Sequence, residues 1–165
     1  MTGQSVTRAA PRHYWDLRHH AWTTTVLAGE WYVTEHDLHL SAVLGSCVAV
    51  CARDRVRLLG GMNHILTPNA SGAALVDALL DRLLALGARA SDLELKVFGG
   101  GRVLSDVADI GARNIDHVLT HLDRRGLAVA AADIGGDTAR RIRYQPSSGR
   151  SLVQHLPIGG SKEAP

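Results

Sequence analysis

The spacing of hydrophobic residues changes along the chain and separates strand-like from helix-like segments. Short runs rich in β-branched and aromatic residues, partly alternating with polar ones, are typical of strands. These runs occupy residues 31–34, 38–43, 47–52, 55–65, 93–98, 127–132, 141–144 and 151–156. Two other segments, residues 72–88 and 114–126, repeat apolar residues every three to four positions, which predicts amphipathic helices.

Both expected helices carry end signals in the sequence. Asn69 or Ser71 suits the cap that begins the first helix, and Gly87 suits the left-handed position after its end. Asn114 is placed to cap the second helix and Gly126 to end it. The order of several strands, helix, strand, helix and several strands predicts a mixed α/β (α+β) fold, in which mixed β-sheets form a single layered domain packed with two main helices.

One domain is expected, because 165 residues bury one full core and no repeat or linker divides the chain. We place its body at residues 26–158. Residues 1–25 are polar and rich in His and Arg, and are expected to form a partly ordered N-terminal extension whose aromatic residues, Trp15 and Trp22, dock onto the body. The tail, residues 159–165, is expected to fray.

Composition narrows the classes of function and partner. Hydrophobic residues make up 45% of the chain, and no apolar run reaches the length of about 18 residues that a membrane helix needs. The N-terminal segment lacks the apolar region of a secretory signal, so the cytoplasm is the expected location, without membrane insertion. The net charge is only +2, the basic residues are scattered and aromatics are 4%, which argues against nucleic-acid binding.

The chain has two cysteines, and the role of Cys47 needs an explanation. A disulfide to Cys51 is excluded on an extended segment, because four residues span about 13 Å. A metal site is disfavoured, since only His64 is an obvious further ligand, and no cofactor is expected. Burial in the core suits Cys51 better than Cys47, which follows Gly45 and Ser46 at a strand entrance where the backbone can bend and present N–H groups.

A hairpin would bring Cys47 close to a histidine. If the segments on either side of residues 54–57 pair in antiparallel fashion, opposed residue numbers sum to 111 and Cys47 faces His64, with Cβ atoms about 4.5–5.5 Å apart. A bulge at Gly60-Gly61 would slip the register by one residue and turn one side chain away. A buried core histidine is the alternative interpretation of His64.

A thiol beside an imidazole supports nucleophilic catalysis. A neighbouring imidazolium lowers the thiol pKa from about 8.5, so that a thiolate exists at neutral pH. The same histidine can then protonate a poor leaving group. A third polar group normally orients the histidine, and Ser41, Ser46 and Asn63 are the candidates.

Several motifs in matching order give the chain a family resemblance. "VLGSCVAVCARD", "GGMNHIL", "LELKVFGGGRVL", "IGARN", "DIGGDTARRIRY" and "SSGRSLV", within residues 13–156, together resemble the chemoreceptor glutamine deamidase family CheD. The leader "HYWD" with "LAGEWYVT" is similar to the N-terminal part of proteobacterial members. The specific part is "LGSCVAVC" joined to "GGMNH", with seventeen residues from the cysteine to the histidine.

The resemblance implies a cytoplasmic enzyme that hydrolyses glutamine side-chain amides in chemoreceptor helices to glutamate and ammonia through a thioester. It implies a fold related to toxin deamidases of the cytotoxic necrotizing factor type and, in many species, a CheC-type phosphatase as partner. Cys47 and His64 match the family's catalytic cysteine and histidine. The family threonine falls on Ser41, which keeps a hydroxyl able to accept a hydrogen bond from the imidazole N–H but loses the methyl group.

Other readings of the sequence stay open. The chain could be a non-catalytic adaptor of the same fold that binds a receptor or a CheC-type phosphatase, or a thiol hydrolase with a different protein substrate. The "GGGR" segment at residues 99–102 is expected to form a tight turn under the active site, since it lacks the Lys-Ser/Thr of a phosphate-binding loop. Arg113-Asn114 is expected to anchor the second helix rather than to contact substrate.

Overall fold

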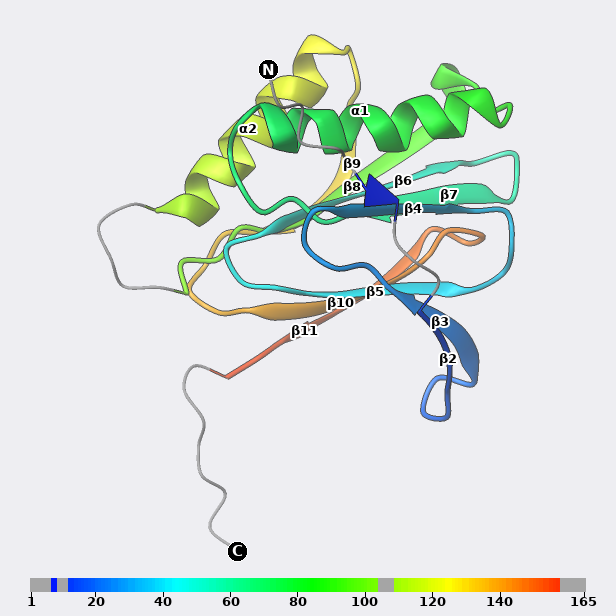
Figure 1. The fold of residues 1–165 in the computed structure, drawn as a ribbon, viewed down its shortest axis with the longest axis horizontal. Helices are drawn as coiled ribbons and strands as arrows, with labels where there is room; N and C mark the ends of the chain where they lie inside the picture. Colours follow the sequence, from blue (N-terminus) through cyan, green and yellow to red (C-terminus); the bar gives the residue numbers. More distant parts are fainter. Residues whose placement is uncertain (1–6, 9–11, 104–108, 158–165) are drawn as a thin grey trace, which may run out of the picture.

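The computed structural model describes residues 7–8, 12–103 and 109–157, and these form three layers. Two helices cover one face of a six-stranded sheet, and a five-stranded sheet lies against its other face (Figure 1). This is the mixed α+β architecture that the order of elements predicts. The expected relation to toxin deamidases of the cytotoxic necrotizing factor type stays a prediction, and the tail at 159–165 lies outside the described residues.

The six-stranded sheet is the central layer. In spatial order it consists of β1 (Thr7–Arg8), β4 (Glu30–Thr34), β7 (Leu59–Asn63), β6 (Val48–Asp54), β8 (Leu93–Gly99) and β9 (Val129–Ile134). The pairs β1–β4 and β8–β9 are parallel and the other pairs are antiparallel. Strand β7 is buried along its whole length and β6 nearly so, because both faces of this sheet are covered.

The five-stranded sheet is the outer layer and has one open face. Its order is β11 (Arg150–His155), β10 (Arg140–Gln145), β5 (His39–Leu44), β3 (Ala21–Thr25) and β2 (His13–Asp16). Along β5 the side chains alternate in direction, as strand geometry requires. Leu40, Ala42 and Leu44 belong to the core between the sheets, whereas Val43 is exposed on the other face.

Part of the predicted N-terminal extension is built into the outer sheet. Residues 13–25 form the β2–β3 hairpin, and Thr23 and Thr24 of β3 are fully buried beside β5. Trp15 and Trp22 pair across the hairpin, with ring centroids 5.8 Å apart and planes at 74°. Both rings stay about half exposed, at 46% and 53%, so they contact each other and remain open to solvent.

The first helix follows the sequence signals. Helix α1 spans Ala70–Ala85, and the Asn69 side chain caps its start by accepting a hydrogen bond from the Ser71 N–H at 2.9 Å. Leu86 is the C-cap, and Gly87 after it has a φ of +102°, the left-handed conformation expected there. A short 3₁₀ turn, Ala90–Asp92, leads into β8.

The second helix begins earlier than the sequence analysis predicted. Helix α2 spans Ile110–Arg124, and its cap is Asp109, which accepts from the Ala112 N–H at 2.9 Å. The predicted cap, Asn114, lies inside the helix and is fully buried. Asn114 has a cap-type side chain, but Asp109 offers the same acceptor one turn earlier, so the prediction of the cap was wrong.

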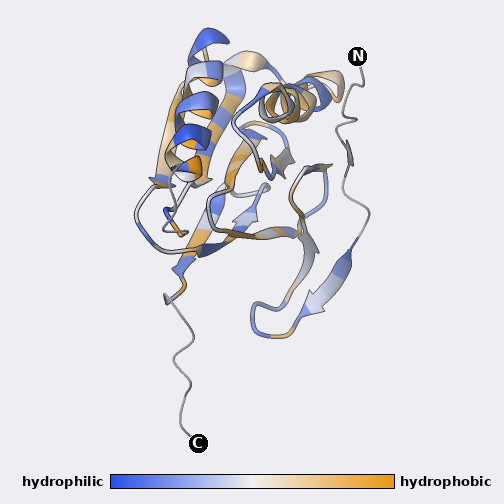
Figure 2. Cartoon of the chain, turned by 60° about the vertical axis from the view of Figure 1, so that its left-hand side comes forward, coloured by the Kyte–Doolittle hydropathy of each residue, from blue (hydrophilic) through white to orange (hydrophobic). Residues whose placement is uncertain are grey.

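Two hydrophobic clusters fill the spaces between the layers. The first lies between the helices and the six-stranded sheet and includes Val48, Ile65, Val76, Leu79 and Val118. The second lies between the two sheets and includes Val26, Leu40, Ala49, Cys51 and Met62. Both helices carry hydrophobic and hydrophilic bands, as their amphipathic pattern predicts (Figure 2). Neither has the length and hydrophobicity that spanning a bilayer requires, within the described residues.

Candidate active site

Cys47 lies in the loop between β5 and β6, and the backbone of this loop is held from one side. Three consecutive carbonyls accept hydrogen bonds: Gly45 from the Gly101 N–H at 2.9 Å, Ser46 from the Asn114 side-chain amide at 2.9 Å, and Cys47 from the Gly100 N–H at 2.8 Å. The Cys47 side chain is half-buried and packs against the core between the sheets. The thiol therefore sits on a fixed backbone at a strand entrance.

The turn that holds this loop is the predicted glycine turn. Gly99 and Gly100 have φ values of +104° and +71°, which favour glycine. A Cβ atom added to Gly99 would lie 2.2 Å from the Cys47 carbonyl oxygen. Glycine at this position therefore allows the turn to approach the cysteine loop closely.

His64 is buried and is held by the loop between β3 and β4. Its side chain and backbone are 6% exposed overall. Its backbone N–H donates to the Glu30 carbonyl at 3.0 Å, and its carbonyl accepts from the Gly29 N–H at 2.8 Å. The ring Nδ1 lies 3.0 Å from the Val26 carbonyl oxygen. A carbonyl only accepts hydrogen bonds, so Nδ1 carries the proton and Nε2 of the neutral ring is a free base.

The register of β6 and β7 differs from the prediction by two positions. Cys51 pairs with Met62, and an isolated bridge joins Val48 to Ile65, so paired residue numbers sum to 113 rather than 111. Cys47 and His64 are therefore diagonal neighbours across the Val48–Ile65 bridge and not directly opposed. A shift of two residues keeps side chains on the same face, and diagonal neighbours are about 7–8 Å apart at Cα, within reach of longer side chains.

The two side chains lie on the same side of the six-stranded sheet. Val48 and Ile65 point into the core beneath the helices, so their neighbours in the chain point the other way. In agreement, Cys47 packs against the core between the sheets, and the His64 ring bonds to Val26, a member of that core. The arrangement can bring a thiol to an unprotonated imidazole nitrogen.

Burial favours the neutral form of both groups. Burial raises the pKa of the Cys47 thiol above its ordinary value, and the Cys47 backbone N–H offsets this only in part. Burial lowers the pKa of His64, against the smaller raising effects of the hydrogen bond to Val26 and the charge of Glu30. The sequence predicts a thiolate beside an imidazolium. These pKa directions instead favour a neutral thiol beside a neutral imidazole in the resting protein.

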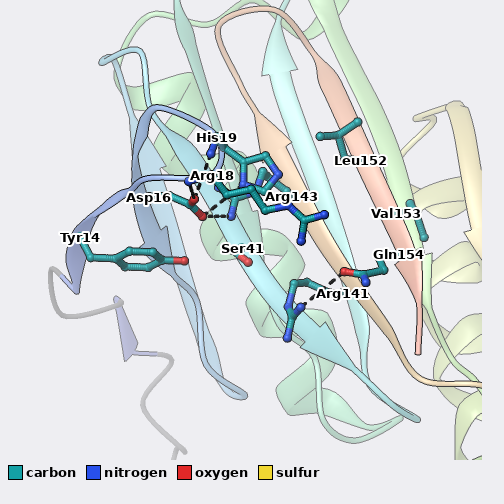
Figure 3. Close-up of a pocket in the computed structure, with 10 residues that line it drawn as sticks. All are labelled: Tyr14, Asp16, Arg18, His19, Ser41, Arg141, Arg143, Leu152, Val153 and Gln154. Carbon is teal, nitrogen blue, oxygen red and sulfur yellow. Dashed lines mark hydrogen bonds and ion pairs between the residues drawn. The ribbon is translucent and has the colours of Figure 1, made fainter. Parts of the chain in front are cut away.

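Ser41 lies on the opposite face of the outer sheet from the core. It is 7% exposed and lines an open cavity of about 580 Å³ with residues from β2, β10 and β11 (Figure 3). The cavity is lined by Tyr14, Asp16, Arg18, His19, Ser41, Arg141, Arg143, Leu152, Val153 and Gln154. The backbone of Ser41 does reach the site indirectly, because its carbonyl accepts from the Val26 N–H at 3.0 Å. The His64 ring Nδ1–H donates to the Val26 carbonyl, where the sequence predicts the Ser41 hydroxyl as acceptor.

The other two candidates for orienting the histidine, Asn63 and Ser46, make hydrogen bonds to other partners. The Asn63 side-chain oxygen accepts from the Val50 N–H at 2.8 Å, so it pairs with β6 next to the Val48–Ile65 bridge. Ser46 contributes the carbonyl that Asn114 holds. Val26, which orients the ring, carries no chemical signal in its side chain and was missed. Of the two residues predicted to anchor α2, Asn114 does so through its neutral side-chain amide, whereas Arg113 is exposed.

Both cysteines are free thiols, as the spacing argument predicts. Cys51 is fully buried in the core between the sheets, which confirms the core interpretation for that residue. Among residues 7–8, 12–103 and 109–157, no group of three His, Cys, Asp or Glu side chains is arranged to hold a metal ion.

Comparisons with known proteins connect this geometry to a family. A family model described as CheD chemotactic sensory transduction matches residues 62–155. A protein of Halorhodospira halophila is 38% identical over 160 residues, which cover 87% of this chain and 74% of that protein. One of Bordetella petrii is 43% identical, covering 89% and 72%, and one of Cupriavidus metallidurans is 40% identical, covering 94% and 78%. All three carry the name probable chemoreceptor glutamine deamidase CheD.

Among solved structures, the crystal structure of the Bacillus licheniformis hypothetical protein YfiH is similar in part. The TM-score is 0.45 at 16% sequence identity, over 77% of this chain and 62% of that one. The family assignment rests on the sequence relatives and on the family model, which begins just before His64 and runs through α2 to the end of β11. The chain therefore belongs to the CheD family.

Proposed function

We propose that this protein hydrolyses the side-chain amide of glutamines in chemoreceptors, with Cys47 as nucleophile and His64 as general base and acid. The observation that carries the proposal is the fixed tautomer of His64: the Nδ1–H bond to Val26 leaves Nε2 free on the face that Cys47 also occupies. The relatives' name, chemoreceptor glutamine deamidase, supports the substrate class.

The first half of the reaction forms a thioester. His64 Nε2 takes the Cys47 proton as the sulfur bonds to the glutamine amide carbon, and the carbonyl electrons move to the oxygen. We assign the Cys47 backbone N–H, which belongs to the same residue as the attacking sulfur, as the donor to that oxygen. The carbon–nitrogen bond then breaks as His64 returns the proton to the leaving nitrogen, which departs as ammonia.

The second half releases glutamate. A water molecule gives a proton to His64 Nε2 as its oxygen bonds to the thioester carbon. The carbon–sulfur bond breaks, and the sulfur regains its proton from His64. The net reaction consumes one water and yields a glutamate side chain and ammonia, with no external oxidant or metal in the balance.

Ser41 belongs to this unit as a positioning residue. Its carbonyl holds the Val26 N–H, and the Val26 carbonyl holds the His64 ring. The family threonine and the serine of this chain are equivalent in this role, because the backbone makes the bond. This accounts for a serine at the position without loss of the histidine's orientation.

The substrate sets the expected location and partners. A target on chemoreceptor cytoplasmic helices places the protein in the cytoplasm, acting on an exposed helical surface without entering the membrane. A CheC-type phosphatase, expected from the resemblance, stays a predicted partner.

The test is deamidation of purified receptor cytoplasmic fragments, read by mass spectrometry of individual glutamines. We expect the wild-type protein to convert specific glutamines to glutamate and Cys47→Ala to convert none, because the thiol forms the covalent intermediate. Cys51→Ala is the matched control: its sulfur is fully buried in the core, so this variant loses packing but keeps the reaction.

Two outcomes would contradict the proposal. Receptor binding without any conversion by the wild-type protein would support the adaptor function. Conversion that persists in Cys47→Ala would show that another group is the nucleophile.

A further inference from the structure

We infer that Asn114 is a positioning residue of the active site, one that fixes the cysteine loop and the histidine segment relative to each other; the inference rests on the proposed function. Asn114 lies on α2, far from both segments in the sequence, and is fully buried. Its side-chain amide nitrogen donates to two carbonyls, Ser46 at 2.9 Å and Leu66 at 3.1 Å. One acceptor directly precedes Cys47 and the other follows His64 by two residues.

The bond to Ser46 also sets the direction of a potential oxyanion donor. In a planar trans peptide the carbonyl oxygen and the next N–H point in opposite directions. When Asn114 holds the Ser46 carbonyl toward α2, the Cys47 N–H of the same peptide unit points away from α2. Asn114 therefore aims the donor that the proposed mechanism places on the developing oxyanion.

The bond to Leu66 ties the histidine side of the site to the same atom. Leu66 follows Ile65, whose backbone makes both bonds of the bridge to Val48. The Asn114 side-chain amide thus connects the cysteine loop to the histidine segment, next to the isolated bridge that continues the β6–β7 pairing. Loss of this amide would leave only the bridge and the neighbouring Asn63–Val50 bond to set the spacing between thiol and imidazole on this pair of strands.

Asn114 lowers the stability of the helix in which it lies, which supports a role beyond packing. Asparagine is a poor residue for a helix interior. Its side-chain oxygen is buried and has no hydrogen-bond partner within the described part of the chain. A buried unpaired acceptor is destabilising by about 1–3 kcal/mol. An aliphatic side chain would pack here without that cost, so the two donated bonds are what the residue provides.

The experiment compares Asn114→Leu with Val118→Ala in the full-length protein. Leucine keeps a similar volume and removes both donors. Val118 is one turn further along α2 and equally buried, but makes only apolar contacts, so its truncation lowers stability without touching the two segments. We expect Asn114→Leu to lower kcat by about 10- to 100-fold with little change in KM. Val118→Ala should lower the melting temperature and keep kcat.

A second readout separates this inference from the proposed function. The rate of Cys47 alkylation and its dependence on pH should change in Asn114→Leu and match wild type in Val118→Ala, whether or not receptor glutamines are converted. Equal kcat and equal Cys47 alkylation in Asn114→Leu and wild type would overturn the inference. Absence of deamidation by the wild-type protein, with altered alkylation in Asn114→Leu, would overturn the proposed function alone. If Asn114→Leu does not fold, Asn114→Ala provides the same comparison.

Discussion

At the scale of single residues, the cysteine and the histidine differ from the pair that the sequence predicts. The sequence analysis predicts a thiolate stabilised by an imidazolium, but burial shifts both pKa values toward the neutral forms. A neutral pair keeps the sulfur protonated until a substrate amide arrives. In the proposed mechanism His64 acts as a base at the moment of attack, which requires the free Nε2 that the Val26 bond provides.

This difference is measurable by alkylation with iodoacetamide across pH. Only the thiolate reacts, so a raised pKa means that Cys47 reacts slowly at pH 7 and that its rate still rises above about pH 8.5. His64→Ala should leave this profile nearly unchanged, because no imidazolium stabilises the resting thiolate. Cys51 serves as the internal control: it is fully buried and its pKa is raised by burial, so it should stay unmodified in the folded protein.

A plateau of the Cys47 rate near or below neutral pH, lost in His64→Ala, would show instead that the resting pair is ionic. That result would restore the thiolate–imidazolium pair predicted from the sequence.

At the scale of elements, the glycine turn between β8 and α2 fixes the cysteine loop. Its two N–H groups hold the carbonyls of Gly45 and Cys47, and its backbone comes too close to Cys47 for any side chain at Gly99. The turn and the loop therefore form one rigid unit, and a change in one must displace the other.

Gly99→Ala tests this coupling, with Gly87→Ala as the matched control. Both glycines have nearly the same positive φ, +104° and +102°, which disfavours alanine at each. A Cβ at Gly87 meets nothing within 4 Å. Gly87→Ala should therefore lower the free energy of unfolding by about 1 kcal/mol and keep its activity. Gly99→Ala should unfold at lower urea concentration than Gly87→Ala and lose deamidation, because its Cβ would press on the Cys47 carbonyl. Equal activity of the two variants would show that the loop position is not critical.

The elements themselves were largely predictable, because hydrophobic period decides strand and helix. The leucine repeat located α1, and of the two predicted caps, Asn69 and Ser71, the structure has Asn69. The register of β6 and β7 was not predictable, because the length of the hairpin turn sets it and this length leaves no hydrophobic pattern. Cys47 and His64 still fell on one face, since a shift of two residues preserves side-chain direction.

At the scale of the whole molecule, the N-terminal hairpin is fastened to the outer sheet by a buried cation. The Arg143 guanidinium, 7% exposed, donates to the Asp16 carboxylate of β2 and to the Thr23 hydroxyl of β3, as Figure 3 shows for Asp16. Burial raises the pKa of Asp16, but hydrogen bonds from His19 and the Arg143 charge outweigh it and lower the pKa to about 2. The carboxylate therefore stays ionised and paired until the pH falls well below 4.

Arg143→Ala should destabilise the protein strongly, because it leaves Asp16 without its buried cation. Arg141, two residues earlier on β10, is the control: it is exposed and contacts only Gln154, at 3.4 Å, among the hydrogen bonds of the described residues. Arg141→Ala should change the free energy of unfolding by no more than about 0.5 kcal/mol. Urea unfolding at pH 7 measures the loss of stability in both variants. Near pH 2 the difference in stability between Arg143→Ala and the wild-type protein should be smaller, because protonation of Asp16 removes the same ion pair in the wild-type protein. Equal urea midpoints at pH 7 would contradict the assigned role.

The sequence could not place this N-terminal segment in the sheet. Its strands, HYWD and AWTTT, are short and lack a hydrophobic pattern, and β3 pairs in parallel with β5, a partner fourteen residues or more away. Its burial comes from threonines and from a cation on β10, residues that composition assigns to the surface. Long-range charge pairing of this kind leaves no periodic signal in the sequence.

The partner of His64 is a main-chain oxygen, and this makes the orientation of the ring independent of the identity of the residue that supplies that oxygen. Any side chain at position 26 that fills the space between the sheets retains the carbonyl that accepts from the His64 ring. Any side chain at position 41 that tolerates an extended strand retains the carbonyl that accepts from the N–H of residue 26. Substitutions at these two positions should therefore be tolerated whatever the chemical group of the new side chain, provided that its size and shape fit. Inactivating changes there should act by displacing the backbone rather than by deleting a functional group.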